Sequence, residues 1–285
     1  MATVPIEQAP PAGTLVVKRH SAVVRLAHWL NALAMVFLIG TGLNIFNAHP
    51  MLYWGEYGAT ADADRRWLSI AAAGRKGGPY GYVEIGSLRV ETTGVLGLST
   101  GANGQLQALG FPGWATFPSY RDLGTARNWH FFWAWVLILN GLLYLGHGLV
   151  SGHIRRDILP RLKELAPANV LHDIARHARL DFPKGEEARR YHVLQKLAYG
   201  GMVLVLVPLV IFTGLGMSPG MNAAWPWLLE LFGGRASARS LHFVAMALIV
   251  GFIVVHLLMV LLAGPINGIR AMVTGKLRIA RESLT

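Results

Sequence analysis

The sequence predicts an all-α integral membrane protein, a bundle of four transmembrane helices with a long periplasmic loop between the first and second helices. Of its 285 residues, 53% are apolar and only 14% are charged, whereas an ordinary soluble domain has about 25% charged residues. The mean hydropathy is +0.41. The apolar residues are segregated into blocks of the roughly 20 residues that cross a bilayer, which favours a membrane protein over a large soluble core.

The elements follow from these apolar blocks. In chain order we expect a cytoplasmic tail (1–21), a first transmembrane helix (22–46), a periplasmic loop (47–126), a second helix (127–150), a cytoplasmic basic segment (151–190), a third helix (191–217), a short periplasmic segment (218–238), a fourth helix (239–263) and a cytoplasmic tail (264–285). Residues Met1–Thr14 are polar and contain three prolines, and they predict a disordered tail. They lack the pattern of a cleavable secretory signal, so the first helix should remain as an anchor.

The positions of lysine and arginine set the orientation. Nine of them lie between the second and third helices, whereas the segment that leads into the fourth helix has only Arg235 and Arg239. The positive-inside rule therefore predicts that both termini are cytoplasmic. The net charge is +11, but the basic residues flank apolar blocks and do not form one face. We therefore expect membrane lipid, and no nucleic acid, as a partner.

The connecting segments carry weaker signals. The 47–126 loop is rich in Gly, Pro, Tyr and Trp, and its Val83–Thr93 portion alternates weakly, which predicts a hairpin. A loop of this length usually has a function or fold of its own; a docking surface for a periplasmic partner and a passive cap over the second helix are equally open. Arg155–Arg190 is expected to form a basic amphipathic helix at the membrane surface. Trp225 and Trp227 are typical of an interfacial aromatic belt.

Histidines recur at the ends of the apolar blocks. Three times an arginine stands three residues before a histidine, as Arg25/His28, Arg127/His130 and Arg239/His242, and a fourth histidine, His256, follows His242 by fourteen residues. Residues i and i+3 share a helix face, so each arginine lies one turn nearer to water than its histidine. Fourteen residues at 1.5 Å each put His242 and His256 about 21 Å apart, on nearly the same side of one helix.

The predicted topology gives each histidine a depth, and the depths predict pairs. His130 and His242 lie near the outer face, and His28 and His256 near the inner face. Each pair joins two helices, as a haem iron held by two axial imidazoles requires. The alternative is that these histidines bridge helices by hydrogen bonds, but four depth-matched histidines favour the metal-ligating interpretation.

Other residues leave alternatives open. The arginines are either snorkelling cations, which suits Arg25, or partners of haem propionates, which suits the outer-side Arg127 and Arg239 better. His147 lies at the inner depth and is an alternative ligand to His28. Cysteine is absent, which excludes disulfides, thiolate-bound metal centres and covalently attached c-type haem.

These motifs resemble those of bacterial four-helix di-haem cytochromes b, the cytochrome b561-type group that includes the b subunits of membrane-bound hydrogenases and formate dehydrogenases. The resemblance covers about residues 20–275 and rests on Arg25-Leu-Ala-His28-Trp-Leu-Asn31, Ala126-Arg-Asn-Trp-His130-Phe, Leu194-Gln-Lys-Leu-Ala-Tyr199 with Thr213-Gly214, and Ala238-Arg-Ser-Leu-His242 with His256. It implies two haem b groups, one on His28 and His256 and one on His130 and His242.

The resemblance also implies a quinone site near the inner haem, at Tyr191–Gln195. His192 stands where related sequences tend to have Asn; it either hydrogen-bonds a quinone and shuttles a proton or is a simple interfacial residue. Gln195 and Lys196 are candidate neighbours of the quinone. The segment Leu52-Tyr53-Trp54-Gly55 looks like that of a subgroup often encoded beside a periplasmic molybdopterin oxidoreductase of the sulfite-oxidase type.

The expected function is that of an electron-transfer subunit of an oxidoreductase, which passes electrons between a periplasmic redox partner and the quinone pool. Quinone reductase or quinol oxidase activity would belong to that role. Two alternatives stay open: a stand-alone quinone-coupled oxidase of a small substrate such as superoxide, and a haem-free metal transporter. The transporter would need its histidines clustered, whereas these are split between two depths.

Overall fold

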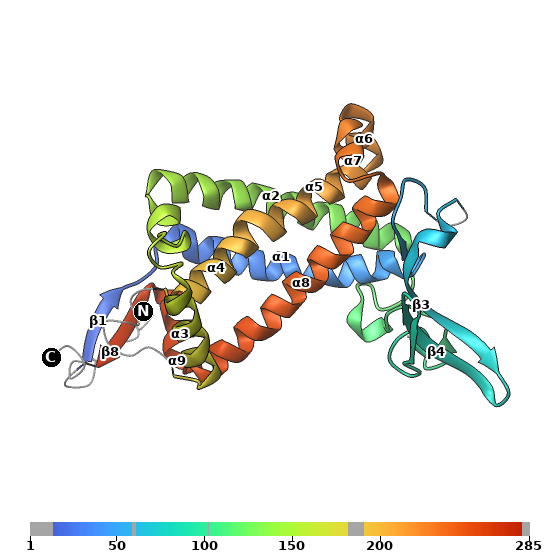
Figure 1. Ribbon diagram of the computed structural model, residues 1–285, viewed down its shortest axis with the longest axis horizontal. Coiled ribbons are helices and arrows are strands. Elements are labelled where there is room, and N and C mark those ends of the chain that lie inside the picture. The colour runs from blue at the N-terminus through green and yellow to red at the C-terminus, as the bar shows by residue number, and fades with distance from the viewer. Residues whose placement is uncertain (1–13, 59–60, 102, 182–190, 281–285) are drawn as a thin grey trace, which may run out of the picture. The chain divides into compact units, whose positions relative to one another are not determined.

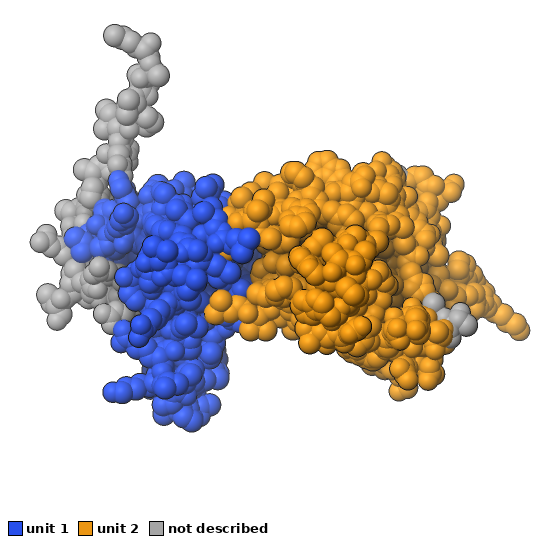
Figure 2. All heavy atoms as spheres, turned by 90° about the horizontal axis from the view of Figure 1, so that it is seen from above, with its two compact units in different colours: residues 1–29, 142–203, 251–285 blue, residues 30–141, 204–250 orange. Residues whose placement is uncertain are grey.

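The structure, a computed structural model, describes residues 14–58, 61–101, 103–181 and 191–280. Except for Thr14, the expected disordered tail Met1–Thr14 lies outside the described residues. The chain forms two compact units: unit 1 contains residues 1–29, 142–203 and 251–285, and unit 2 contains residues 30–141 and 204–250 (Figure 2).

Among the described residues, four helices are long and apolar enough to cross a membrane, which agrees with the four spans expected. They are α1 (Ala22–Phe46), α2 (Leu123–Val150), the interrupted helix Val193–Met217, and α8 (Arg235–Leu262) (Figure 1). Helices α2 and α8 begin four residues earlier than the sequence indicates. For α2 the reason is Asp122, whose Oδ1 accepts a hydrogen bond from the Thr125 amide at 3.0 Å and caps the helix.

The third span is interrupted at its middle. It consists of α4 (Val193–Gly201), a π-helical turn (Met202–Leu206) and α5 (Val207–Met217). Pro208 has no amide hydrogen to donate to the preceding turn, and a widened turn directly before it accommodates the lost hydrogen bond.

The expectation of an all-α protein is wrong for the segment between α1 and α2. There, in unit 2, β2 (Met51–Tyr53), β3 (Arg66–Arg75), β4 (Gly78–Ile85) and β5 (Leu88–Glu91) form an antiparallel sheet in that order. The same segment contains the two-stranded sheet of β6 (Ser99–Thr100) and β7 (Leu106–Gln107) and the 3-10 turns Ala63–Arg65 and Gly113–Ala115. The hairpin expected at Val83–Thr93 is present as β4–β5, in which Val83 pairs with Val90.

This segment is fastened to the ends of α1 and α8 within unit 2. Asn44 of α1 donates from Nδ2 to the carbonyls of Pro118 and Tyr120, at 2.8 Å each. Ser240 of α8 donates to the Tyr53 carbonyl at 2.6 Å and accepts from Trp67 Nε1 at 2.9 Å. Since Asn44 and Ser240 are buried, these bonds replace water and hold the segment in a fixed arrangement.

A small hydrophobic core lies under the sheet. Phe46, Leu52, Leu68 and Ile70 are buried together. Two short helices, α6 (Pro219–Ala224) and α7 (Trp227–Leu231), connect α5 to α8 in the same unit (Figure 1).

Unit 1 contains structure where the sequence predicts tails. Strand β1 (Thr14–Lys18) pairs antiparallel with β8 (Lys276–Ala280), and the two strands lie side by side in Figure 1. Helix α9 (Pro265–Thr274) leads into β8. The expected single helix Arg155–Arg190 is wrong: a π-helical turn (Ile154–Ile158) is followed by the shorter α3 (Pro167–Ala178), because Pro160 and Pro167 interrupt a helix, and residues 182–190 lie outside the described residues.

Candidate functional site

The His130 and His242 side chains lie close together in unit 2. Their ring centroids are 6.3 Å apart and the ring planes make an angle of 57°. His130 comes from the first turns of α2 and His242 from the first turns of α8. The structure therefore brings together the two histidines that the sequence assigns to one depth.

Each of these rings is held by a threonine from a further helix. Thr41 Oγ1 of α1 is 3.0 Å from His130 Nδ1, and Thr213 Oγ1 of α5 is 3.0 Å from His242 Nδ1. Both threonines are almost completely buried, with 1% and 0% of their surface exposed. Each ring is therefore anchored through Nδ1, and Nε2 is the nitrogen available to a metal.

The His28 and His256 side chains form the second pair, in unit 1. Their ring centroids are 6.4 Å apart at an interplanar angle of 60°. Aromatic rings surround them: Phe252 stacks on His256 at 5.7 Å, Tyr199 meets His256 edge-on at 6.3 Å, and Trp29 meets His28 edge-on at 5.2 Å. These apolar neighbours provide a setting of low dielectric around the pair.

His147 is engaged elsewhere. Its Nε2 lies 3.1 Å from the Ser21 hydroxyl, which ties the end of α2 to the start of α1 in unit 1. His28 has His256 as its ring partner, so the geometry favours His28 over His147 as the candidate ligand.

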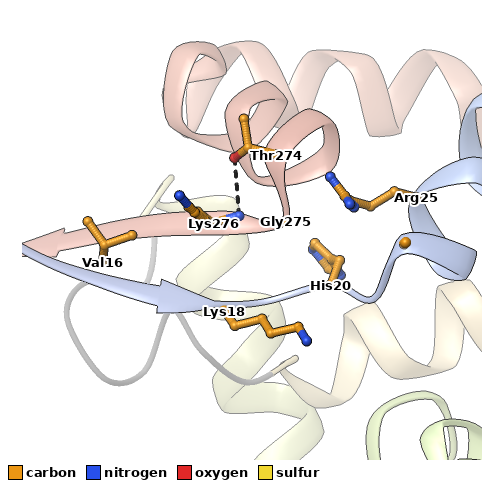
Figure 3. Close-up of a pocket in the computed structure, with 8 residues that line it drawn as sticks. Val16, Lys18, His20, Arg25, Thr274, Gly275 and Lys276 are labelled. Atoms are coloured by element: carbon orange, nitrogen blue, oxygen red, sulfur yellow. Dashed lines mark hydrogen bonds between the residues drawn. The ribbon is translucent and has the colours of Figure 1, made fainter. Parts of the chain in front are cut away.

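The three arginines of the repeats have three different environments. Arg25 donates to the Val273 carbonyl at the end of α9 and lines a cavity of about 370 Å³ with Lys18, His20 and Lys276. Figure 3 shows its side chain beside Thr274 and Gly275. A cation at this position complements the negative end of the α9 dipole.

The other two arginines belong to unit 2. Arg239 Nη2 donates to the His49 carbonyl at 2.5 Å, and its guanidinium lies 5.4 Å from the centre of the Phe46 ring. Arg127 is exposed and lies 5.8 Å from the centre of the Phe131 ring.

The His192–Gln195 segment forms the start of α4 in unit 1. The Gln195 side chain accepts a hydrogen bond from the His192 amide at 3.1 Å in a capping box. His192 Nδ1 lies 3.2 Å from the buried carboxylate of Asp173. The buried Lys196 ammonium is paired with Glu164 at 2.8 Å. His192 and Gln195 thus both help to begin the helix, and a role in binding quinone would come in addition to this one.

The two histidine pairs fit axial ligation of a metal. An imidazole nitrogen binds a metal ion at about 2.0–2.1 Å, and the ring centroid lies about 1 Å further away, so two imidazoles on opposite sides of one ion have centroids roughly 6 Å apart. The observed separations of 6.3 and 6.4 Å agree with this value. Within the described residues, no group of three or more His, Cys, Asp or Glu side chains could hold a metal ion.

A sequence profile of the prokaryotic cytochrome b561 family matches residues 19–275. The chain belongs to the prokaryotic cytochrome b561 family. It is therefore a cytochrome b561-type membrane electron-transfer subunit, and membership implies haem b as the cofactor.

One relative of this b561 chain comes from Azospira oryzae and is named "Putative protein-methionine-sulfoxide reductase subunit YedZ1". It is 32% identical over 144 residues, which cover 49% of this chain and 67% of the relative. No solved structure matches the chain significantly.

Sequence reasoning did not give roles to several residues of this b561 chain. Thr41 and Thr213 are separated from the histidines they contact by 89 and 29 residues. A shared Thr-Gly dipeptide, Thr41-Gly42 and Thr213-Gly214, was the available signal. Asp173, the partner of His192, carried no signal because its burial depends on how α3 packs on α4.

Proposed function

We propose that this chain is a di-haem b-type cytochrome of the bacterial inner membrane, with both termini cytoplasmic, that transfers electrons between a periplasmic redox partner and the quinone pool. The observation that carries the proposal is the pair of bis-histidine arrangements, with separations of 6.3 and 6.4 Å. One pair lies in each compact unit, which supports two cofactors per chain.

His28 and His256 are the proposed ligands of one haem, and His130 and His242 of the other. Haem held by these four imidazoles would supply one-electron transfer chemistry. The protein's own part is to fix the four imidazoles, to keep water from them with aromatic and aliphatic side chains, and to supply cations. Arg239, which is mostly buried beside the sheet segment, and Arg127 are the proposed propionate partners in unit 2, and Arg25 in unit 1.

The segment between α1 and α2 supports a protein partner on the periplasmic side. It is a folded sheet fastened by buried hydrogen bonds to α1 and α8, and it exposes large aromatic side chains, including Trp114 with 81% of its surface exposed. Folded, exposed aromatic surface suits docking better than a passive cap. The relative from Azospira oryzae is named as a reductase subunit, which supports an oxidoreductase as this partner. The resemblance of Leu52-Tyr53-Trp54-Gly55 to a subgroup encoded beside enzymes of the sulfite-oxidase type favours a periplasmic, molybdopterin-dependent one.

The start of α4 is the proposed place of quinone exchange. The contact of His192 with the Asp173 carboxylate gives an imidazole that can hold a proton and return it. Two-electron chemistry of a quinone takes up or releases two protons, so a titratable group beside the site is a requirement that His192 meets.

A quinol-reduction experiment tests the proposal. The full chain in liposomes is mixed anaerobically with duroquinol, and the reduced-minus-oxidised spectrum is followed. We expect haem b bands that quinol reduces, about tenfold more slowly in His192→Ala at unchanged haem content. His177→Ala is the matched control, because His177 Nδ1 also contacts Asp173, but at its backbone carbonyl.

Three results would contradict parts of this account. Folded protein without haem would leave a metal transporter as the better function. Haem that no quinol reduces would remove the quinone pool as the reaction partner. Oxidation of a small substrate such as superoxide by the isolated chain, at a rate that a partner does not change, would favour the stand-alone oxidase.

A further inference from the structure

Two Thr-Gly dipeptides in unit 2 hold the two histidines of one pair in the same way. We call Thr41-Gly42 of α1 and Thr213-Gly214 of α5 the Thr-Gly seats. Thr41 Oγ1 contacts the Phe37 carbonyl at 2.6 Å, the Leu38 carbonyl at 3.3 Å and His130 Nδ1 at 3.0 Å. Thr213 repeats this at the same three distances, with the Leu209 carbonyl, the Val210 carbonyl and His242 Nδ1.

This geometry determines which ring nitrogen carries the proton. A hydroxyl has one hydrogen to donate, and the 2.6 Å contacts to the carbonyls four residues earlier take it. Each threonine oxygen can then only accept a hydrogen bond from its histidine, so Nδ1 carries the hydrogen in both rings. The remaining nitrogen, Nε2, keeps its lone pair for the iron.

The glycine of each seat gives the ring its room. A Cβ atom on Gly42 would lie 3.3 Å from His130 Cε1, and a Cβ on Gly214 would lie 3.4 Å from His242 Cε1. A Cβ at Gly42 would press on the His130 ring, and a Cβ at Gly214 would already be in van der Waals contact with the His242 ring, so neither position has room for a larger side chain on that side. The hydroxyl and the missing side chain therefore act together on the same imidazole.

In the other pair, no such seat holds His28. The Nδ1 atom of His28 is buried and has no hydrogen-bond partner among the described residues, and Trp29 meets its ring edge-on. The two pairs thus have similar ring separations. They differ in that a threonine oxygen contacts Nδ1 of His130 and of His242, whereas Nδ1 of His28 has no such contact among the described residues.

We propose that Thr41 and Thr213 are positioning residues that lower the reduction potential of the haem on His130 and His242. This inference rests on the proposed function. A hydrogen bond from Nδ1–H to the threonine oxygen makes the imidazole a more basic ligand. A more basic ligand stabilises the oxidised iron more than the reduced iron, so the potential falls. Loss of the hydroxyl should therefore raise the potential of this haem and leave the other unchanged.

A redox titration of the purified full chain tests the proposal. Thr41→Val and Thr213→Val keep the shape of the side chain and remove the hydroxyl. Of the two midpoint potentials, each valine variant should raise the same one. The expected rise corresponds to about a tenfold change in the oxidised-to-reduced ratio at a given potential, which is 59 mV for one electron. Thr41→Ser and Thr213→Ser keep the hydroxyl and should restore the wild-type value.

The control is Thr274→Val in α9. Thr274 makes the same bond to the carbonyl four residues earlier, Thr274 Oγ1 to Arg270 O at 2.8 Å, and it is not one of the threonines that hold a histidine. This variant should change neither potential. It separates the effect of the histidine contact from the general effect of removing a threonine-to-backbone hydrogen bond.

The outcomes distinguish this inference from the proposed function. Two haems per chain with potentials unchanged in both valine variants would overturn the inference and leave the function intact. If the two valine variants changed two different potentials, the claim that Thr41 and Thr213 act on the same haem would be overturned. A wild-type chain without haem would contradict the proposed function itself, and the haem content measured in the same samples reports this directly.

Discussion

The three Arg-x-x-His repeats place their arginines in different surroundings. The Arg239 guanidinium donates a hydrogen bond to the His49 carbonyl and lies over the Phe46 ring. The exposed Arg127 lies near the Phe131 ring. Burial, and then the Arg239 charge, lower the pKa of His49, so His49 is neutral at pH 7. The repeat spacing is thus shared, but the contacts are set by the segment that packs on each helix end.

Replacing Arg239 should therefore cost more stability than replacing Arg127. Arg239→Met removes a charge-assisted hydrogen bond and leaves the His49 carbonyl without that donor, a loss of about 2 kcal/mol. Arg127→Met removes an exposed cation and should change stability by less than about 0.5 kcal/mol. Thermal unfolding of the purified protein measures both losses. Equal decreases in Tm for the two variants would contradict this difference.

The Glu164–Lys196 ion pair at the start of α4 should be sensitive to pH. Burial raises the pKa of Glu164, but the hydrogen bonds and charge of Lys196 outweigh it, and the net effect lowers the pKa below 4.5. A carboxyl group with a lowered pKa stabilises the folded state above its unfolded pKa and loses this contribution as the pH falls through the folded value. Stability should thus be constant near pH 7 and decline below about pH 4.5.

Glu164→Gln should remove this pH dependence and leave the buried Lys196 ammonium without its carboxylate. Because Glu164 is partly exposed, we expect a loss of about 2 kcal/mol, less than for a fully buried pair. The double variant Glu164→Gln/Lys196→Met should recover most of it. Thermal unfolding between pH 4 and pH 7 checks this, and a double variant no better than the single one would argue against the pair.

At the scale of elements, the four long helices and the β4–β5 hairpin were predictable, and the rest of the sheet was not. Composition alone identified four apolar spans, and Asp122 explains why α2 begins before its apolar block. Strand β3 shows no regular alternation of buried and exposed residues, since its three consecutive residues Leu68–Ile70 are all buried, although its partner β4 follows it directly in the chain. The single amphipathic helix at Arg155–Arg190 was over-predicted because a run of basic residues does not outweigh two prolines.

The close approach of α1 to His130 gives a prediction about Gly42. Gly42→Ala would bring a Cβ to 3.3 Å from the ring, so His130 must shift and the haem on this pair should be bound more weakly by about tenfold. Gly141→Ala in α2 is the matched control, because a Cβ there meets nothing within 4 Å. Haem content per chain measures both, and full haem content in Gly42→Ala with an unchanged spectrum would contradict the tight fit.

At the scale of the whole molecule, the site was partly predictable. Repeated spacing and depth indicated which histidines pair, and the rings of both predicted pairs are in contact distance. The threonines that hold one pair could not be assigned, since nothing local in the sequence connects Thr41 with His130 across 89 residues. The partner surface was left open for a similar reason, because contacts with α8 far along the chain, such as Trp67 with Ser240, hold the sheet segment in place.

The most direct test of the central claim is the number of haem b groups per chain in a set of histidine variants, measured by pyridine haemochrome. We expect two in the wild type, one in His28→Ala, one in His242→Ala and none in the double variant. His147→Ala should keep two, because His147 contacts Ser21. Two haems in His242→Ala, or the loss of one in His147→Ala with folding intact, would contradict the ligand assignment.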